Sequence, residues 1–210
     1  MAQFFSLHAD SPQPRLIRQA ANIVRDGGLI VFPTDSAYAL GGHLGDAALL
    51  DRIRRLRGVD ERHHFTLLCR DLSEIATFAR VDNVQYRLLK AATPGPYTFI
   101  LEGTRELPRR LLHPRRKTIG LRVPEHPVVA ALLAELGEPL LSSTLLLPGE
   151  EMPLTDAVEI RARLEREVEL VIEAGVCRPE ATTVIDLSTG APVLVRAGRG
   201  RLESFGLAEH

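Results

Sequence analysis

The residues best suited to chemistry in this sequence are serines, threonines, arginines and one aspartate at the ends of short apolar runs. They are Thr34, Asp35, Ser36, Thr98, Thr118, Arg122, Ser142, Ser143, Thr144, Thr182, Thr183 and Arg196. Hydroxyl groups donate hydrogen bonds to anionic oxygens, and arginine can hold a carboxylate or phosphate with two parallel bonds. Each such residue alone is ordinary turn or cap chemistry. Together they predict a pocket of mixed polarity for an anionic ligand at the strand ends.

The stretch "FPTDSAYALGG", residues 32–42, follows an apolar run that is typical of a buried strand. We expect this stretch to form the floor of the pocket, with hydroxyls from Thr34 and Ser36 and a wall from Tyr38. Gly41 and Gly42 would let the backbone approach a ligand closely. The alternative is a tight, capped strand-to-loop turn that binds nothing.

The most basic part of the chain is the segment 103–117. Its cations are Arg105, Arg109, Arg110, Arg115, Arg116 and Lys117. One interpretation is a solvated arginine-rich loop, and the other is an edge that contacts the phosphates of RNA. The net charge of -1 favours neither, because the total says nothing about how charge is distributed.

Several familiar sites are absent from the sequence. It has no Walker-type phosphate loop, no Gly-x-Gly-x-x-Gly after the first strand and no Gly-x-Ser-x-Gly elbow. No cysteine lies at metal-ligand spacing from the pair His63-His64, so we expect no bound metal. Cys69 and Cys177 lie far apart in apolar stretches, as reduced thiols would. With no basic start before a long apolar segment, a soluble, cytoplasmic protein without a membrane partner is expected.

The elements that must position these residues can be read from hydrophobic spacing. Helices are expected at 10–26, from 46 with apolar positions to 56, and at 73–78, 83–92, 126–136 and 155–166. Strands are expected at 29–32, 65–69, 97–102, 118–123, 140–144, 170–173, 182–187 and 192–196. The first helix would be capped by Asp10 or Ser11. Because strands and helices do not alternate strictly, we expect one α/β or α+β domain on a mixed sheet, spanning 1–210 with its core at about 13–200.

The motifs of this sequence and their order resemble those of a known family. The ordered motifs "PTDSAYALGG", "PGPYTFIL", "TIGLRVPEHP", "LSSTLLLPG" and "TTVIDLSTGAPVLVRAG" are similar to those of the YrdC/YciO-like family, across nearly the whole chain. The sequence around "HHFTLLCRDLSE" is most similar to the YciO branch of this family. The resemblance implies a single α/β domain, with helices flanking a twisted mixed sheet and a large, positively charged concave cleft.

The resemblance also implies an activity. Characterised members are L-threonylcarbamoyladenylate synthases, which join ATP (with Mg²⁺), L-threonine and bicarbonate and release pyrophosphate, on the pathway to tRNA N6-threonylcarbamoyladenosine. No tightly bound cofactor is expected. Motif by motif, the threonine side would comprise Thr34, Tyr38, Arg122 and Thr182. The nucleotide and phosphate side would comprise Arg55, Arg57, His63, Thr118, Thr144 and Arg196.

Two departures from the synthase pattern bear on activity. Synthases show Lys-x-Arg before the strand "FTLL"; an ungapped match places Arg57 and Val59 there, whereas a shifted match uses Arg55 and Arg57. Synthases also show Ser-x-Asn, where this chain has Thr144 and Leu146. We therefore expect weakened synthase activity, with Arg62, His63 or His64 as candidates to fill the vacated space. The alternative is a non-catalytic paralogue that binds double-stranded RNA or tRNA through Arg109, Arg110, Arg115, Arg116 and Lys117.

Overall fold

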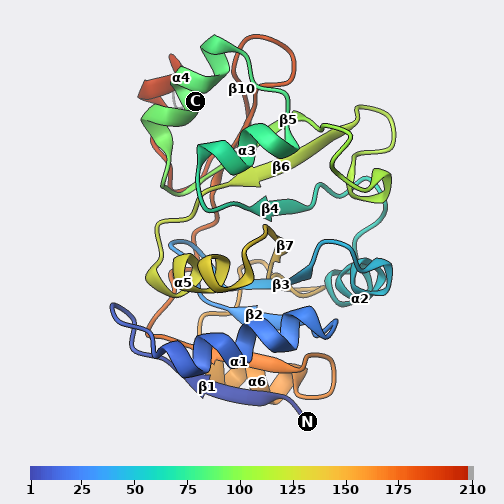
Figure 1. The fold of residues 1–210 in the computed structure, drawn as a ribbon, viewed down its shortest axis with the longest axis vertical. Coiled ribbons are helices and arrows are strands. Elements are labelled where there is room, and N and C mark those ends of the chain that lie inside the picture. Colours follow the sequence, from blue (N-terminus) through green and yellow to red (C-terminus); the bar gives the residue numbers. More distant parts are fainter. Residues whose placement is uncertain (208–210) are drawn as a thin grey trace.

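Within residues 1–207, short apolar runs build a ten-stranded mixed sheet. The computed structural model describes residues 1–207. Its strands are β1 (Gln3–Ser6), β2 (Ile30–Phe32), β3 (Ala39–His43), β4 (Thr66–Leu68), β5 (Tyr97–Glu102), β6 (Thr118–Arg122), β7 (Leu140–Thr144), β8 (Leu170–Glu173), β9 (Thr183–Asp186) and β10 (Val193–Arg196). They lie in the order β1-β8-β2-β3-β7-β4-β6-β5-β9-β10. Figure 1 shows them stacked along the long axis of the molecule, with β1 near one end and β10 near the other.

In the described part of the chain, six α-helices flank the sheet. They are α1 (Pro14–Arg25), α2 (Ala47–Arg57), α3 (Leu72–Phe78), α4 (Asn83–Ala92), α5 (Pro127–Leu136) and α6 (Ala157–Leu164). Aspartate side chains cap four of them, including Asp46 at α2, whose Oδ1 accepts from the backbone amides of Ala48 and Leu49. The expected cap of α1 is wrong: the helix begins at Pro14 after Gln13, which makes no capping bond, because the proline already fixes a helical φ.

In the β1–β7 half of the sheet, both faces are apolar. Ile30 and Phe32 of β2 pack in one cluster with α1 and α5, which lie side by side in front of the sheet in Figure 1. The alternate residues Leu29 and Val31 pack in the other cluster, which includes the buried faces of α2 and α6. This half is therefore a conventional three-layer core.

In the other half, only one face of the sheet joins the core. Phe99 and Leu121 belong to the cluster that contains the buried residues of α3 and α4. The residues that alternate with them along β5 and β6, Thr98, Ile100 and Gly120, instead line a cavity. The face without a helix is thus the face that can receive a ligand.

The predicted fold class is confirmed, since the structure is an α/β domain on a mixed sheet. The strand β3 was not expected, because paired glycines are poor strand formers. A Cβ on Gly41 would lie 2.7 Å from the Phe32 ring and 2.8 Å from the Leu141 carbonyl oxygen. The glycines therefore allow tight packing of β3 against its neighbours. Among residues 1–207, no helix is long and apolar enough to cross a membrane.

Candidate functional site

The cavity on the open face of the sheet has a volume of about 520 Å³. Strand residues Thr66, Thr98, Ile100, Gly120 and Val184 lie along it. Gly120 matters here because a Cβ at this position would lie 2.9 Å from the Thr66 hydroxyl and 3.2 Å from a Thr98 methyl carbon. A side chain larger than hydrogen would therefore clash with the polar residues of two neighbouring strands.

Two arginines, one from the end of α2 and one from the end of β10, line the cavity and donate hydrogen bonds only to neutral acceptors. Arg57, the last residue of α2, donates from Nε to the Leu146 carbonyl oxygen (2.9 Å) and from Nη1 to Ser143 Oγ (2.6 Å). Arg196, at the end of β10, donates from Nε and Nη2 to the Thr182 carbonyl oxygen (3.3 and 3.0 Å). Among residues 1–207, neither guanidinium has a carboxylate within ion-pair distance.

The electrostatics of these two arginines favour an anion between them. Burial lowers the pKa of both guanidiniums, and the positive charge of Arg196 further lowers the pKa of Arg57. Two partly desolvated cations that repel each other are stabilised when an anion compensates them. Arg62 also lines the cavity, as do the carboxylates of Glu151 and Glu180. The predicted net positive charge of the whole cleft stays a prediction.

His63 lies beside Arg57 in the same cavity. Its Nε2 is 3.2 Å from Ser143 Oγ, and its ring meets the Phe65 ring edge-on at 5.5 Å between centroids. Burial, followed by the charges of Arg57 and His64, lowers the pKa of His63 to about 4. The imidazole is therefore neutral at pH 7.

The second histidine of the pair, His64, is within hydrogen-bond distance of the Thr118 hydroxyl. His64 Nε2 lies 3.2 Å from Thr118 Oγ1, and its ring stacks on His113 at 4.8 Å between centroids. Burial, then the neighbouring His113 and Arg116, lowers the pKa of His64. Thr118 itself is buried at the start of β6, so its hydroxyl is oriented by His64.

Arg122, the last residue of β6, does not line the cavity and is already paired within the chain. Its buried guanidinium forms an ion pair with Asp35, whose second carboxylate oxygen accepts from the backbone amide of Glu125 at 3.1 Å. Arg199 donates to the backbone carbonyl of Asp35. Burial lowers the pKa of Arg122, while Asp35 opposes that shift. A carboxylate therefore already occupies the arginine that the resemblance assigns to the threonine carboxylate.

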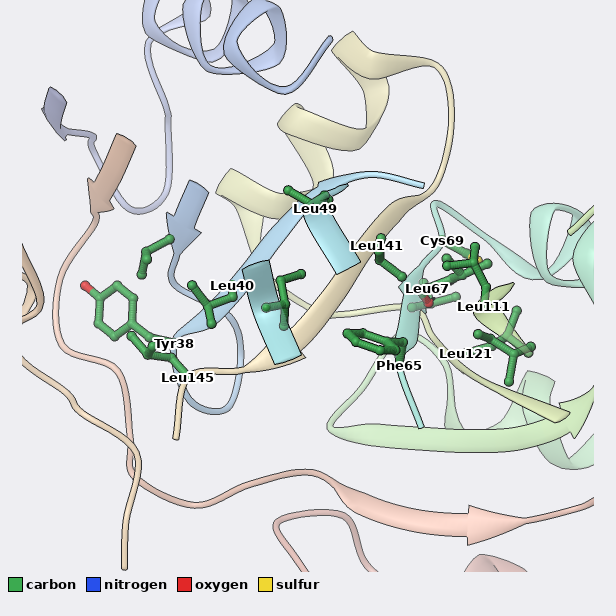
Figure 2. Close-up of a cluster of buried hydrophobic side chains, with 14 of the residues drawn as sticks. Tyr38, Leu40, Leu49, Phe65, Leu67, Cys69, Leu111, Leu121, Leu141 and Leu145 are labelled. Atoms are coloured by element: carbon green, nitrogen blue, oxygen red, sulfur yellow. Dashed lines mark hydrogen bonds between the residues drawn. The ribbon is translucent and has the colours of Figure 1, made fainter. Parts of the chain in front are cut away.

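Thr34 and Tyr38 do not line the 520 Å³ cavity. Thr34 Oγ1 donates to the Ala37 carbonyl oxygen (2.7 Å) and accepts from the Ser36 amide (3.1 Å), so it closes the turn. Tyr38 is fully buried among Leu40 and Leu145, as Figure 2 shows. Within residues 1–207 its hydroxyl has no hydrogen-bond partner, and burial raises its pKa. The substrate roles of both residues stay predictions.

The residues that the two motif alignments use lie in different places. Arg55 points away from the cavity and pairs with Glu167 at 3.3 Å, with 68% of its side chain exposed. Val59 is in the following turn and does not line the cavity, whereas Thr144 and Leu146 do. Whichever alignment holds, Arg57 is the residue of this motif that reaches the cavity.

The basic segment is largely engaged with its own chain. Arg110 donates to the Gly45 carbonyl, Arg116 pairs with Asp186, and Lys117 donates to the Pro114 carbonyl oxygen at 2.8 Å. Arg109 and Arg115 are exposed and have no side-chain hydrogen bond or ion pair in the described part of the chain. The segment therefore offers fewer free cations than its sequence suggests.

The apolar wall of the cavity could not be predicted from the sequence. This wall includes Ile100, Met152, Pro153, Val184 and Val195, of which Met152 and Val195 are 53% and 55% exposed. Exposed apolar side chains beside a polar floor could hold a planar or apolar group. No motif marks these residues, because they come from four separate segments of the chain. Asp35, by contrast, stands next to Thr34 in sequence, but its pairing with Arg122 requires the fold.

Comparisons with known proteins agree with this architecture. The sequence matches the Sua5/YciO/YrdC family model, described as "Telomere recombination", over residues 22–198. It is 55% identical over 205 residues to the uncharacterised protein YciO of Escherichia coli K12, covering 98% of this chain and 100% of YciO. The crystal structure of E. coli YciO superposes with a TM-score of 0.95, again at 55% identity and with 98% and 100% coverage.

More distant relatives have a named activity. The chain is 32% identical over 177 residues to threonylcarbamoyl-AMP synthase of Chromohalobacter salexigens, covering 83% of this chain and 94% of the synthase. The structure of Pyrococcus abyssi Sua5 complexed with L-threonine matches at a TM-score of 0.85 and 25% identity. That match covers 93% of this chain but only 57% of Sua5. On this evidence, the chain belongs to the Sua5/YciO/YrdC family, which includes threonylcarbamoyl-AMP synthases.

Proposed function

We propose that the protein is a cytoplasmic L-threonylcarbamoyladenylate synthase of reduced activity, which binds ATP with Mg²⁺, L-threonine and bicarbonate. The product would enter the pathway to tRNA N6-threonylcarbamoyladenosine. The observation that carries the proposal is the pair of partly desolvated guanidiniums, Arg57 and Arg196, which face one cavity with only neutral acceptors. Such a pair calls for a ligand with several negative charges, as the triphosphate of ATP has.

The proposed reaction asks the protein mainly for alignment and charge. The threonine amine combines with bicarbonate to give a carbamate and water, and a carbamate oxygen then attacks the α-phosphorus of ATP. The bond to the β,γ-phosphates breaks, and pyrophosphate leaves. Arg57 and Arg196 would stabilise the charge on the phosphates, and the apolar wall with Met152 and Val195 would take the base.

The amino acid would bind at Arg122, which lies outside the lining of the cavity but feels the positive charge of Arg196. A threonine carboxylate can replace Asp35 on the Arg122 guanidinium, since both offer the same planar pair of oxygens. The Thr182 hydroxyl, which is 2.9 Å from that of Thr98, lies on the way to the phosphate end. The relative from P. abyssi that was solved with L-threonine supports an amino-acid site in this fold.

Reduced activity follows from the residues at the phosphate end. Leu146 lines the cavity where synthases have an amide, and Arg57 alone of its motif reaches the cavity. Each lost hydrogen bond to a charged group is worth about 1.5 to 3 kcal/mol. Two losses would lower transition-state stabilisation by about 3 to 6 kcal/mol, which is about two to four powers of ten in rate.

The experiment is a pyrophosphate-release assay with ATP, Mg²⁺, threonine and bicarbonate. We expect slow release that requires both threonine and bicarbonate and is lost in Arg196→Met, because this variant removes a phosphate-facing guanidinium. Calorimetric titration with ATP and Mg²⁺ runs in parallel. Failure of the protein to bind ATP or pyrophosphate at millimolar concentration would overturn the proposal.

A second candidate, binding of double-stranded RNA or tRNA, is supported by exposed Arg109 and Arg115, which have no partner among residues 1–207. If these residues contact phosphates, tRNA affinity falls steeply with salt, and each substitution to alanine lowers the salt slope by about one. The intramolecular contacts of Arg110, Arg116 and Lys117 make this the weaker candidate.

A further inference from the structure

We propose that His63 and Ser143 form a proton-coupled ligand for phosphate: binding of the anion reverses the hydrogen bond between them and places a proton on His63. The inference deepens the proposed function and rests on anion binding in the cavity that Arg57 and Arg196 share. It assigns to His63 the role of a conditional cation, which carries charge only when an anion is present. Such a cation would stand in for the second positive residue of the synthase motif.

In the proposed free state, Ser143 donates the hydrogen bond that joins it to His63. Arg57 Nη1 can only donate, so Ser143 Oγ accepts this bond at 2.6 Å. The hydroxyl proton is then available to His63 Nε2, 3.2 Å away, which accepts it in the neutral tautomer that carries its proton on Nδ1. A hydroxyl has one proton, so Ser143 cannot donate to His63 and to a phosphate at the same time.

Anion binding changes what each group can do. When Ser143 turns its proton toward a phosphate oxygen, His63 Nε2 loses its donor. By taking up a proton, His63 becomes a donor and returns a hydrogen bond to Ser143 Oγ. The oxygen then accepts from both Arg57 and His63 while it donates to the phosphate. One proton comes from the solvent, and no bond of the ligand is made or broken.

The charges around His63 set the conditions for this uptake. Arg57 of α2, His64 and Arg196 of β10 disfavour the protonated form, and Asp60 favours it. Arg62, Glu151 and Glu180 line the same cavity. Because burial and the cations lower the pKa of His63 to about 4, the free protein keeps it neutral. A phosphate within a few ångströms reverses the sign of the local potential and raises this pKa.

The linkage has a definite sign. A group whose pKa is low in the free protein and raised in the complex binds a proton together with the ligand. Anion affinity therefore increases as pH falls below the pKa of His63 in the complex, by up to about tenfold per pH unit, until pH approaches the free-protein pKa of about 4. Fixed guanidiniums alone would give no such dependence for an anion of constant charge, such as sulfate.

The test is calorimetric titration of the intact protein with pyrophosphate at pH 6.5, in buffers with different ionisation enthalpies. His63→Gln cannot take up a proton but keeps a group that can hydrogen-bond to Ser143. His43→Gln is the matched control, because His43 lies on β3 and pairs with Glu138 outside the cavity. We expect wild type and His43→Gln to take up about one proton more per bound pyrophosphate than His63→Gln. Subtraction of the variant removes the protons of pyrophosphate itself.

A second readout follows the imidazole directly. In ¹⁵N NMR spectra we expect neutral His63 in the free protein and protonation of both ring nitrogens in the complex. Pyrophosphate binding with equal proton uptake in all three proteins, or with His63 still neutral, overturns the inference and leaves the proposed function standing. If pyrophosphate and ATP both fail to bind to wild type, the inference and the proposed function fail together.

Discussion

The replacement Arg57→Met removes the phosphate-facing guanidinium of α2 while keeping a side chain of similar length. A hydrogen bond between a charged donor and a charged acceptor contributes about 1.5 to 3 kcal/mol. We therefore expect the Kd for ATP or pyrophosphate to rise by about 10- to 150-fold. The Kd should rise and not fall, because Arg57 shares its cavity with Arg196 and has no carboxylate partner among the described residues.

The matched control is Arg55→Met, two residues earlier on the same helix. The Arg55 guanidinium is exposed and pairs with Glu167 outside the cavity, so its loss should change the Kd by less than about twofold. Calorimetry measures both affinities, and circular dichroism verifies that both variants fold. Equal losses in the two variants would refute a local phosphate site, and a loss confined to Arg55→Met would place the site outside this cavity.

Three further predictions concern the rest of the cavity and its surroundings. Asp35→Asn should lower the free energy of unfolding by about 3 to 5 kcal/mol, because it breaks the buried pair with Arg122. Asp51→Asn, at an exposed pair, should lower it by less than about 1 kcal/mol. Urea denaturation measures both values, and similar losses of stability in the two variants would contradict the prediction. Leu146→Asn should tighten ATP binding by about tenfold or more, since it restores an amide at the cavity wall; an unchanged Kd in a folded variant would show that leucine does not limit binding. Cys177 should react with a thiol reagent at pH 7.5 only upon unfolding, because burial raises its pKa to about 11; rapid labelling of the native protein would argue against that burial.

Much of the sheet could be predicted from the sequence, because its strands carry strong local signals. The bounds expected for β5, β7 and β8 are those observed, and so are those of α4, which Asp82 and Gln85 begin with a capping box. The strand β3 could not be predicted from propensity. Its glycines are there because the Phe32 ring and the Leu141 carbonyl leave no room for a Cβ, and this is a property of the assembled sheet.

The candidate site, too, could be predicted only in part from the sequence. Hydroxyls and arginines at strand ends indicated a polar pocket, and Arg57, Thr144, Thr182 and Arg196 do line one cavity. The sequence could not reveal which charges are already compensated. Arg122 has a carboxylate partner and Arg196 has none among residues 1–207, yet both stand at the end of a strand. Pairing depends on distances between distant segments, which residue types alone do not determine.

The strand order also governs when this sheet can form. Among the strands of residues 1–207, β1 pairs only with β8, and β2 pairs with the same strand, so Gln3 and Ile30 both lie opposite Leu170. A nascent chain must therefore expose about 170 residues before its first strand finds a partner. Until then the free edge of β2 is open to pairing with other chains. The N-terminal strand is thus among the last parts of the sheet to be completed during synthesis, although it is the first to be made.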